Sequence, residues 1–315
     1  MNVLRDMSEL NSLRGPVAFA VGVFDGVHLG HQAVIQSALD FTDKHGGTTV
    51  VLTFDPHPLR VLRPDFAPLL LCSAAHKLHI LKRFGVDHVL VLPFTMETAK
   101  TDANAFITTL VSSCRPLGFI SVGYTWSFGR GREGNVHQLM EMGKAHGFGV
   151  YGVPEVKIGE EVVSSTLIRE AVRTGNFLKA GNMLGRDYTV VGKVVRGRQL
   201  GRQLGFPTAN VAIENEELPP LGVYAVEAIL QGRKYSGAAN LGRRPTVEDH
   251  GEQILEVHLL DVDIDLYDSE IEVSFVQLLR KEQKFSGLEE LKSQITRDIE
   301  SGRAVFSARA SANAS

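Results

Sequence analysis

Cysteine is scarce in this chain of 315 residues, which contains only Cys72 and Cys114. The two cysteines are far apart and form no CxxC pair, which argues against a thiolate metal site or a dithiol redox motif. We therefore expect two buried free thiols and a reducing compartment, the cytoplasm.

Excess charge and long apolar runs are also lacking. The 33 Lys and Arg residues nearly balance the 36 Asp and Glu residues, so the net charge is -3. Such a chain has no general attraction for nucleic acid or an anionic membrane, and an anionic ligand must be bound by local groups. No apolar run approaches the roughly 18 residues of a membrane span, and residues 1–15 lack the apolar core of a signal peptide. We expect no membrane or nucleic-acid partner and leave self-association open.

Apolar β-rich runs alternate with helix-like patterns in the first half of the chain. This alternation is typical of a doubly wound parallel sheet with helices on both faces. In such sheets ligands bind at the carboxyl ends of the strands, where the strand order reverses. The predicted strands are 17–24, 48–54, 87–94, 118–124 and 148–156, and the predicted helices lie near 31–44, 74–84, 102–113 and 135–146.

The pattern changes near Gly185, after two further helical segments. Strand-like runs then follow one another without intervening helices, which is typical of a small antiparallel barrel. A helix over 287–301 closes this part. We predict one domain over 1–185, a second over 186–305, and a disordered polar tail over 306–315.

The stretch GVFDGVHLGH places two histidines at the end of the first predicted strand. His28 and His31 flank Gly30 where the apolar run gives way to a helix. Imidazoles at a helix N-terminus can bond phosphate oxygens, and the helix N–H groups and dipole attract the same anion. Gly30 leaves room for the phosphate to approach. The pattern also occurs by chance, so its place between a strand and a helix carries the argument.

Two more loops follow predicted strands and are expected at the same edge of the sheet. TFDPHPLRVL brings His57 and Arg60 there, although its prolines equally fit a stiffened loop. VGYTWSFGRGREGN holds Thr125 and Trp126 before a basic segment that either closes over a nucleotide or stays solvated. Trp126 is suited to stacking on a flavin or adenine ring, or to forming a half-buried wall.

The stretch SSTLIR places hydroxyl groups at the start of a predicted helix. Ser164 or Ser165 is an ordinary N-cap residue in that position. The same hydroxyls, with Arg169 one turn further on, also form a clamp suited to phosphate.

Glycines at a spacing of four mark the stretch GRQLGRQLGFPTANV. Gly197, Gly201 and Gly205 would each cost a helix about 1 kcal/mol, so a loop whose N–H groups wrap phosphate fits better. Thr208 and Asn210 lie two apart on one strand face and offer a hydroxyl and an amide oxygen to a hard cation. An ordinary β-turn that enters a strand is the alternative.

The stretch EVHLLD places Glu256 and His258 on one face of a predicted strand. A carboxylate in that place can take the proton of a hydroxyl that attacks a phosphate. The exposed polar face of an edge strand is the simpler alternative.

These stretches together resemble one enzyme family. GVFDGVHLGH, TFDPHP and SSTLIR resemble the adenylyltransferase half of the bacterial bifunctional riboflavin kinase/FAD synthetases. PTAN, GVYAV, AANLGRRPT, EVHLLD and KFSGLEELKSQI resemble the riboflavin kinase half, which is a six-stranded barrel in that family. The resemblance spans residues of about 15–305, in the family's order.

The resemblance implies two reactions that use ATP with Mg²⁺. Riboflavin becomes FMN in the barrel, and FMN becomes FAD with release of pyrophosphate in the N-terminal sheet. The family's HxGH histidines stabilise phosphate charge in the transition state. The roles implied here are phosphate stabilisation by His28 and His31, binding of the far phosphates by Ser164, Ser165, Thr166 and Arg169, binding of Mg²⁺ and ATP by Thr208 and Asn210, and proton abstraction by Glu256.

Two positions depart from the family pattern. Thr125 stands where Asn or Asp is usual, and it keeps one hydrogen-bonding hydroxyl. Leu167 stands where Arg is usual, so a charge-assisted phosphate contact worth about 1.5–3 kcal/mol is lost. A riboflavin kinase with a weakened or inactive adenylyltransferase is therefore an alternative. A non-catalytic flavin-binding module is another, which the presence of Thr208, Asn210 and Glu256 disfavours.

Overall fold

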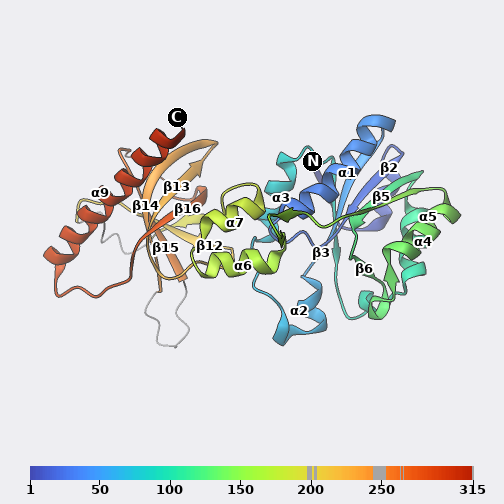
Figure 1. Cartoon of the computed structure of the whole chain (residues 1–315), viewed down its shortest axis with the longest axis horizontal. Helices are drawn as coiled ribbons and strands as arrows, with labels where there is room; N and C mark the ends of the chain where they lie inside the picture. The colour runs from blue at the N-terminus through green and yellow to red at the C-terminus, as the bar shows by residue number, and fades with distance from the viewer. Residues whose placement is uncertain (197–200, 202–203, 244–252, 263, 265, 314–315) are drawn as a thin grey trace. The chain divides into compact units, whose positions relative to one another are not determined.

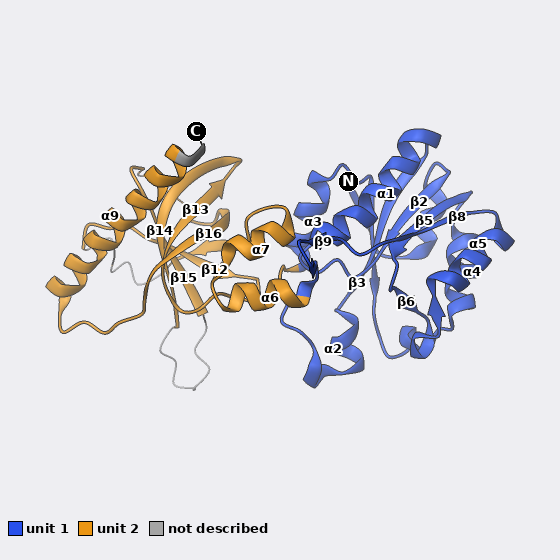
Figure 2. Ribbon diagram, in the orientation of Figure 1, with its two compact units in different colours: residues 1–70, 74–165 blue, residues 71–73, 166–315 orange. Residues whose placement is uncertain are grey.

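Six parallel strands form one sheet in the first half of the chain (Figure 1). The structure is a computed structural model that describes all residues except 197–200, 202–203, 244–252, 263, 265 and 314–315. Contacts divide the chain into two compact units, residues 1–70 with 74–165 and residues 71–73 with 166–315 (Figure 2). The sheet strands are β1 (Asn2–Leu4), β2 (Val17–Val21), β3 (Thr48–Asp55), β4 (His88–Pro93), β5 (Leu117–Gly123) and β8 (Gly149–Val153).

β2 lies where the order of the strands reverses. The order across the sheet is β1-β4-β3-β2-β5-β8. From β2 the chain builds outward through β3 and β4, and it then returns to the other side of β2 to add β5 and β8. The predicted doubly wound sheet is confirmed, with β2 as its central strand. The sequence did not predict β1, which has only 3 residues.

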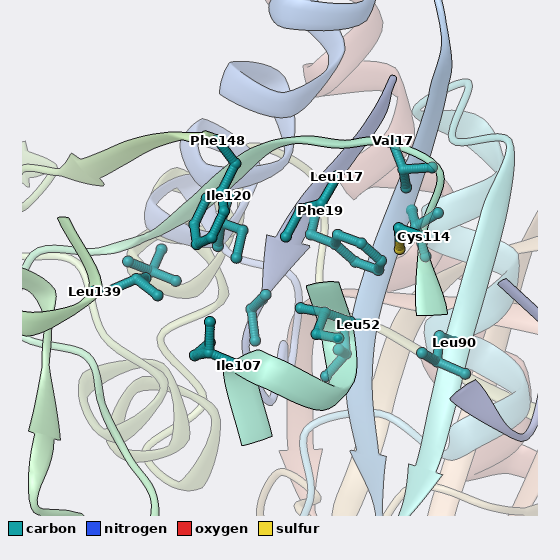
Figure 3. Packing of buried hydrophobic residues seen from close by; sticks show 14 of the residues in the cluster. Val17, Phe19, Leu52, Leu90, Ile107, Cys114, Leu117, Ile120, Leu139 and Phe148 are labelled. Atoms are coloured by element: carbon teal, nitrogen blue, oxygen red, sulfur yellow. The ribbon is translucent and has the colours of Figure 1, made fainter. Parts of the chain in front are cut away.

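Both faces of this sheet are buried beneath helices. Val17, Phe19 and Val21 of β2 pack into one hydrophobic cluster, whereas Ala18 and Ala20 pack into the opposite one. Figure 3 shows Phe19 in the first cluster. Because a strand alternates its side chains, burial of both faces requires a continuously apolar run.

The helices of the first unit divide between the two clusters. Side chains of α4 and α5 belong to the cluster of Phe19, and side chains of α1 and α3 belong to the other. The α-helices are α1 (Leu29–His45), α2 (Pro58–Leu62), α3 (Ala74–Arg83), α4 (Ala103–Ser113) and α5 (Val136–His146). The unit also contains four short 3-10 helices, which are η1 (Met7–Ser12), η2 (Pro64–Phe66), η3 (Thr98–Lys100) and η4 (Arg130–Arg132). Two pairs of short strands complete it, β6 (Ser127–Phe128) with β7 (Gly134–Asn135) and β9 (Lys157–Ile158) with β10 (Glu161–Val162).

Six antiparallel strands close into a barrel in the second unit, in the order β11-β12-β15-β14-β13-β16. The barrel closes because β16 pairs with both β13 and β11. The predicted six-stranded barrel is therefore confirmed. Its strands are β11 (Thr189–Val195), β12 (Ala209–Ile213), β13 (Gly222–Leu230), β14 (Arg233–Arg243), β15 (Gln253–Leu259) and β16 (Glu270–Lys281), and its helices are α6 (Ser165–Arg173), α7 (Phe177–Leu184) and α9 (Leu288–Asn313).

The last helix is longer than the sequence predicts. α9 continues to Asn313, so the predicted disorder is wrong for residues 306–313. This extension contains several alanines, which favour the helix. Arg309 also lies 4.0 Å from a carboxylate oxygen of Asp187 and 3.9 Å from one of Glu227. The composition alone predicts a polar tail, because neither the helix propensity of the alanines nor these distant charges is evident as a local pattern.

The two cysteines are buried and free, as predicted. Burial raises the pKa of the Cys114 thiol to about 12, so this thiol stays protonated and unreactive. Within the described ranges, no helix has the length and apolarity needed to cross a membrane.

A largely buried ion pair joins α9 to β16. Arg280 donates to the Asp298 carboxylate through Nε at 2.9 Å and through Nη2 at 2.8 Å. The two side chains are 20% and 8% exposed. Gln294 Nε2 donates to the same carboxylate at 2.8 Å. Bidentate geometry and a third donor make this a strong attachment for the helix.

Replacing Arg280 with alanine is expected to lower the free energy of unfolding by about 3 kcal/mol, because it leaves the Asp298 carboxylate buried without its cation. Urea denaturation followed by circular dichroism measures this change. Arg303→Ala is the matched control, because the Arg303–Asp261 pair is 49% and 69% exposed and should contribute little. Equal shifts in both variants would contradict the prediction.

Candidate active sites

His28 caps the helix that begins at the end of the sheet. Its backbone is extended, and its Nδ1 accepts a hydrogen bond from the backbone N–H of His31 at 3.3 Å. Because Nδ1 is the acceptor, the neutral ring carries its proton on Nε2. His28 therefore satisfies the first turn of α1 through Nδ1.

The two imidazoles are stacked, with ring centroids 3.6 Å apart and planes inclined by 19°. The edge of Phe24 packs against His31, with centroids 5.3 Å apart. Burial lowers the pKa of His31 well below its ordinary value, and repulsion from Lys77 and from any protonated form of His28 lowers it further. His31 is therefore neutral at pH 7 and acts as a hydrogen-bonding group.

The loop between β2 and α1 is held in an unfavourable conformation. Phe24 and Val27 have φ values of 54° and 43°, which side chains other than glycine rarely adopt. Both side chains are fully buried, so packing maintains the strain. Lys77 Nζ and Thr53 Oγ1 both donate to the carbonyl of Val23, at 2.9 and 3.0 Å. The sequence analysis missed Lys77, because nothing in the pattern of α3 connects it to this loop.

Gly30 lies directly against the His28 ring. A Cβ at this position would be 3.1 Å from His28 Cε1 and 3.3 Å from Nδ1. We expect Gly30→Ala to displace the ring and to reduce any reaction at this site about 10²-fold, because small misplacements of a reacting geometry are costly. Steady-state rates of the two predicted reactions measure the effect, and only the adenylyltransferase should fall. Gly302→Ala is the control, since a Cβ there meets nothing within 4 Å. An unchanged rate for Gly30→Ala would contradict the prediction.

The SSTLIR stretch begins at the same loop. Ser165 Oγ donates to the carbonyl oxygen of Asp25 at 3.0 Å. The Cβ position of Gly30 is 4.0 Å from the carbonyl oxygen of Val163. The structure thus brings the start of α6, with Ser164 and Ser165, to the HxGH loop. The remaining two predicted phosphate ligands, Thr166 and Arg169, follow on α6 in the second unit.

His57 and Trp126, which were predicted at the same edge of the sheet, have identifiable structural partners. His57 caps α2, and its Nδ1 accepts from the N–H of Leu59 at 3.2 Å. Trp126 stacks on Phe128 with centroids 4.5 Å apart and packs against the hydrophobic cluster of Phe19. Thr125 is exposed beside it. These residues follow β3 and β5, the neighbours of β2 in the sheet.

The second candidate site is a cavity of about 410 Å³ in the barrel unit. Asn210 of β12 and Glu256 of β15 are directly paired across the two strands. Both line the cavity, together with Gly201, Thr208 and His258. The barrel unit therefore gathers the predicted hydroxyl, amide and carboxylate around one cavity, which α9 also lines.

A hydrogen bond connects the turn before β12 to β15. His258 Nδ1 lies 2.8 Å from the carbonyl oxygen of Pro207, and its N–H donates to it. A Cβ on Gly201 would lie 2.5 Å from the carbonyl oxygen of Phe206, so this close turn requires glycine. Gly205 has a φ of 91°, in the left-handed region that glycine tolerates. Gly197 lies outside the described residues.

These two sites define a class of enzyme. The two imidazoles lie at the N-terminus of a helix, at the point in the sheet where the strand order reverses. This arrangement forms a site for nucleotide phosphates. A carboxylate beside hydroxyl and amide oxygens can activate a hydroxyl that receives a phosphate. The chain is thus a two-site transferase of phosphate-containing groups.

Comparison with known proteins specifies the family. The FAD synthetase model matches residues 11–167, and the riboflavin kinase model matches residues 184–306. The chain is 40% identical over 287 residues to the bifunctional riboflavin kinase/FMN adenylyltransferase of Escherichia coli (strain K12), with 91% of each chain covered. It is 36% identical over 307 residues to that of Haemophilus influenzae, covering 97% of this chain and 99% of the relative.

A crystal structure named as a macrolide-efflux protein, from Streptococcus pneumoniae, is also similar. It has a TM-score of 0.81 and 30% identity, with 96% of this chain and 98% of that chain covered. The chain belongs to the bifunctional riboflavin kinase/FMN adenylyltransferase family. The resemblance drawn from the motifs is confirmed.

Proposed function

We propose that two separate sets of residues give this chain the two activities of its family. The chain phosphorylates riboflavin to FMN and adenylylates FMN to FAD, each with ATP. One observation carries this assignment: each set of motifs gathers around its own site. Ser165 contacts the HxGH loop at the edge of the sheet. Thr208, Asn210 and Glu256 line one cavity of the barrel unit.

In the adenylyltransferase site, the FMN phosphate attacks the α-phosphorus of ATP, and pyrophosphate leaves. His28 donates from Nε2 to a phosphate oxygen, and the neutral His31 hydrogen-bonds beside it. The N-terminus of α1 adds its N–H groups and positive dipole end. These groups stabilise charge that develops on the phosphates without forming a covalent intermediate. The far phosphates are bound by Ser164, Ser165, Thr166 and Arg169.

In the kinase site, Glu256 accepts the proton of the ribityl 5′-hydroxyl as that oxygen attacks the γ-phosphorus of ATP and ADP leaves. Thr208 and Asn210 bind the ATP phosphates, and their hydroxyl and amide oxygens fit a hard cation such as Mg²⁺. When bound, Mg²⁺ neutralises phosphate charge. The backbone N–H groups at Gly201 and Gly205 bind the phosphates, and Gly197, which has the same proposed role, lies outside the described residues.

Several finer assignments are part of the same proposal. Thr125, Trp126 and His57 lie at or near the flavin of the adenylyltransferase site. The domain boundary lies at 185/186, which agrees with the start of the riboflavin kinase match at 184, although contacts group α6 and α7 with the barrel. Balanced charge and two free thiols support a cytoplasmic location. Self-association is tested by light scattering.

A product time course tests the proposed function. Purified protein is incubated with riboflavin, ATP and Mg²⁺, and the flavins are separated by chromatography. FMN should appear first and then convert to FAD. FMN that accumulates without FAD would instead favour the kinase-only alternative and identify Thr125 and Leu167 as the cause. Absence of FMN would refute the kinase assignment.

A further inference from the structure

Lys77 of α3 contacts the loop that joins β2 to the HxGH helix. Its Nζ donates to the carbonyl oxygen of Val23 at 2.9 Å, across 54 positions of sequence. The hydroxyl of Thr53, a residue that is 1% exposed, donates to the same oxygen at 3.0 Å. A hydrogen bond from an ammonium group is charge-assisted and is therefore the stronger of the two. One carbonyl is thus held from α3 and from β3, at the edge of the sheet where ligands bind.

The residue that follows Val23 is strained and supports His31. Phe24 has a φ of 54° and is 1% exposed. The edge of its ring packs against the His31 ring, with centroids 5.3 Å apart. Because this backbone conformation is unfavourable by itself, surrounding contacts must maintain it. The hydrogen bonds to the Val23 carbonyl are such contacts, one residue before Phe24.

The charge of Lys77 also acts on His31. Burial is the main cause of the low pKa of His31, and repulsion from Lys77 adds to it. The ammonium group therefore lies near the imidazole and helps to keep it neutral. A cation in this place suits two roles, which are direct binding of ATP phosphates and support of the loop. The hydrogen bond from Lys77 to a backbone carbonyl favours the second role.

We propose that Lys77 is a positioning residue for the adenylyltransferase reaction, which holds Phe24 and the His31 ring in place through the carbonyl of Val23. This rests on the proposed role of HxGH at the phosphates. His31 acts on charge that develops in the transition state, so a displaced ring should slow the reaction without weakening the binding of ATP or FMN. Lys77 itself touches neither substrate.

Lys77→Met is the first variant, because methionine is also long and unbranched but lacks the charge and the donor. The kcat for FAD formation from FMN should fall about tenfold, while the KM values for ATP and FMN stay unchanged. Lys77→Arg restores a cationic donor and should recover most of the loss in kcat. Lys82→Met is the matched control, because Lys82 is exposed on the same helix, and it should leave kcat unchanged.

Thr53→Val tests the path through the Val23 carbonyl. Valine keeps the branched shape and removes the hydroxyl donor, so kcat should fall about threefold, again at unchanged KM. In each single variant one donor still holds the carbonyl, whereas in the double variant with Lys77→Met neither donor remains. The loss of kcat in the double variant should therefore exceed the product of the two single losses, because residues that share a partner are coupled.

A raised KM for ATP at unchanged kcat in Lys77→Met would overturn the proposal and would make Lys77 a ligand of the phosphates. A double variant whose loss equals the product of the single losses would also overturn it. Thermal unfolding followed by circular dichroism checks that each variant folds. If Lys77→Met does not fold, Thr53→Val and Lys77→Arg decide, and a wild-type kcat in Thr53→Val overturns the proposal.

His31→Ala separates this failure from that of the proposed function. If His31→Ala still forms FAD at the wild-type rate, the role of HxGH is wrong. If it forms almost none while Lys77→Met keeps the wild-type kcat, only the role of Lys77 is wrong.

Discussion

His31→Ala should reduce the formation of FAD from FMN by about 10²–10³-fold, the usual cost of removing a group that stabilises charge in the transition state. The His31 ring is neutral, its Nδ1 atom is buried, and the ring stacks on that of His28. Its removal also takes away the support of the His28 ring. Formation of FMN from riboflavin should keep the wild-type rate, because no residue of the barrel cavity is changed.

Rates of FMN and FAD formation, measured separately with riboflavin or FMN supplied, give the result. His79→Ala is the matched control, because His79 is exposed on α3 and lies outside the proposed site. It should leave both rates unchanged. An unchanged FAD rate in His31→Ala would mean that HxGH is not the phosphate site.

Glu256→Gln should reduce FMN formation by about 10²–10⁴-fold, the usual contribution of a positioned base. The amide keeps the volume of the side chain but cannot accept the proton of the attacking hydroxyl. FAD formation from supplied FMN should persist, because that reaction needs no group of the barrel.

The same two assays measure the Glu256 variant, with Glu270→Gln as control. Glu270 is exposed at the start of β16 and does not line the cavity. Loss of both reactions in Glu256→Gln would contradict separate sites. An undiminished rate of FMN formation would remove Glu256 from the mechanism.

The sequence was sufficient to predict the sheet and barrel because the local patterns agree with the tertiary fold. The run that contains β2 is continuously apolar, as a strand buried on both faces must be. The strands of the barrel follow one another without helices, which favours an antiparallel sandwich or barrel, and the family resemblance favoured the barrel. HxGH was also predictable, because it joins a strand to a helix and both flanking elements are evident.

Other features depend on contacts that no local pattern encodes. β1 is too short to show a period, and Arg309 at the end of α9 lies near Asp187 and Glu227, which are distant in the sequence. Lys77 reaches the carbonyl of Val23 across 54 positions of sequence. The pairing of Asn210 with Glu256 follows from strand register, which the sequence between β12 and β15 does not specify.

The most direct test of the central claim is to mix the His31→Ala and Glu256→Gln variants in one reaction. Neither variant alone should convert riboflavin to FAD with ATP and Mg²⁺. If two independent sites make FMN and then FAD, the His31→Ala protein supplies FMN and the Glu256→Gln protein converts it, so the mixture should form FAD after a lag. A mixture that forms no FAD, although each variant retains its own single reaction, would contradict the account of two sites linked by free FMN.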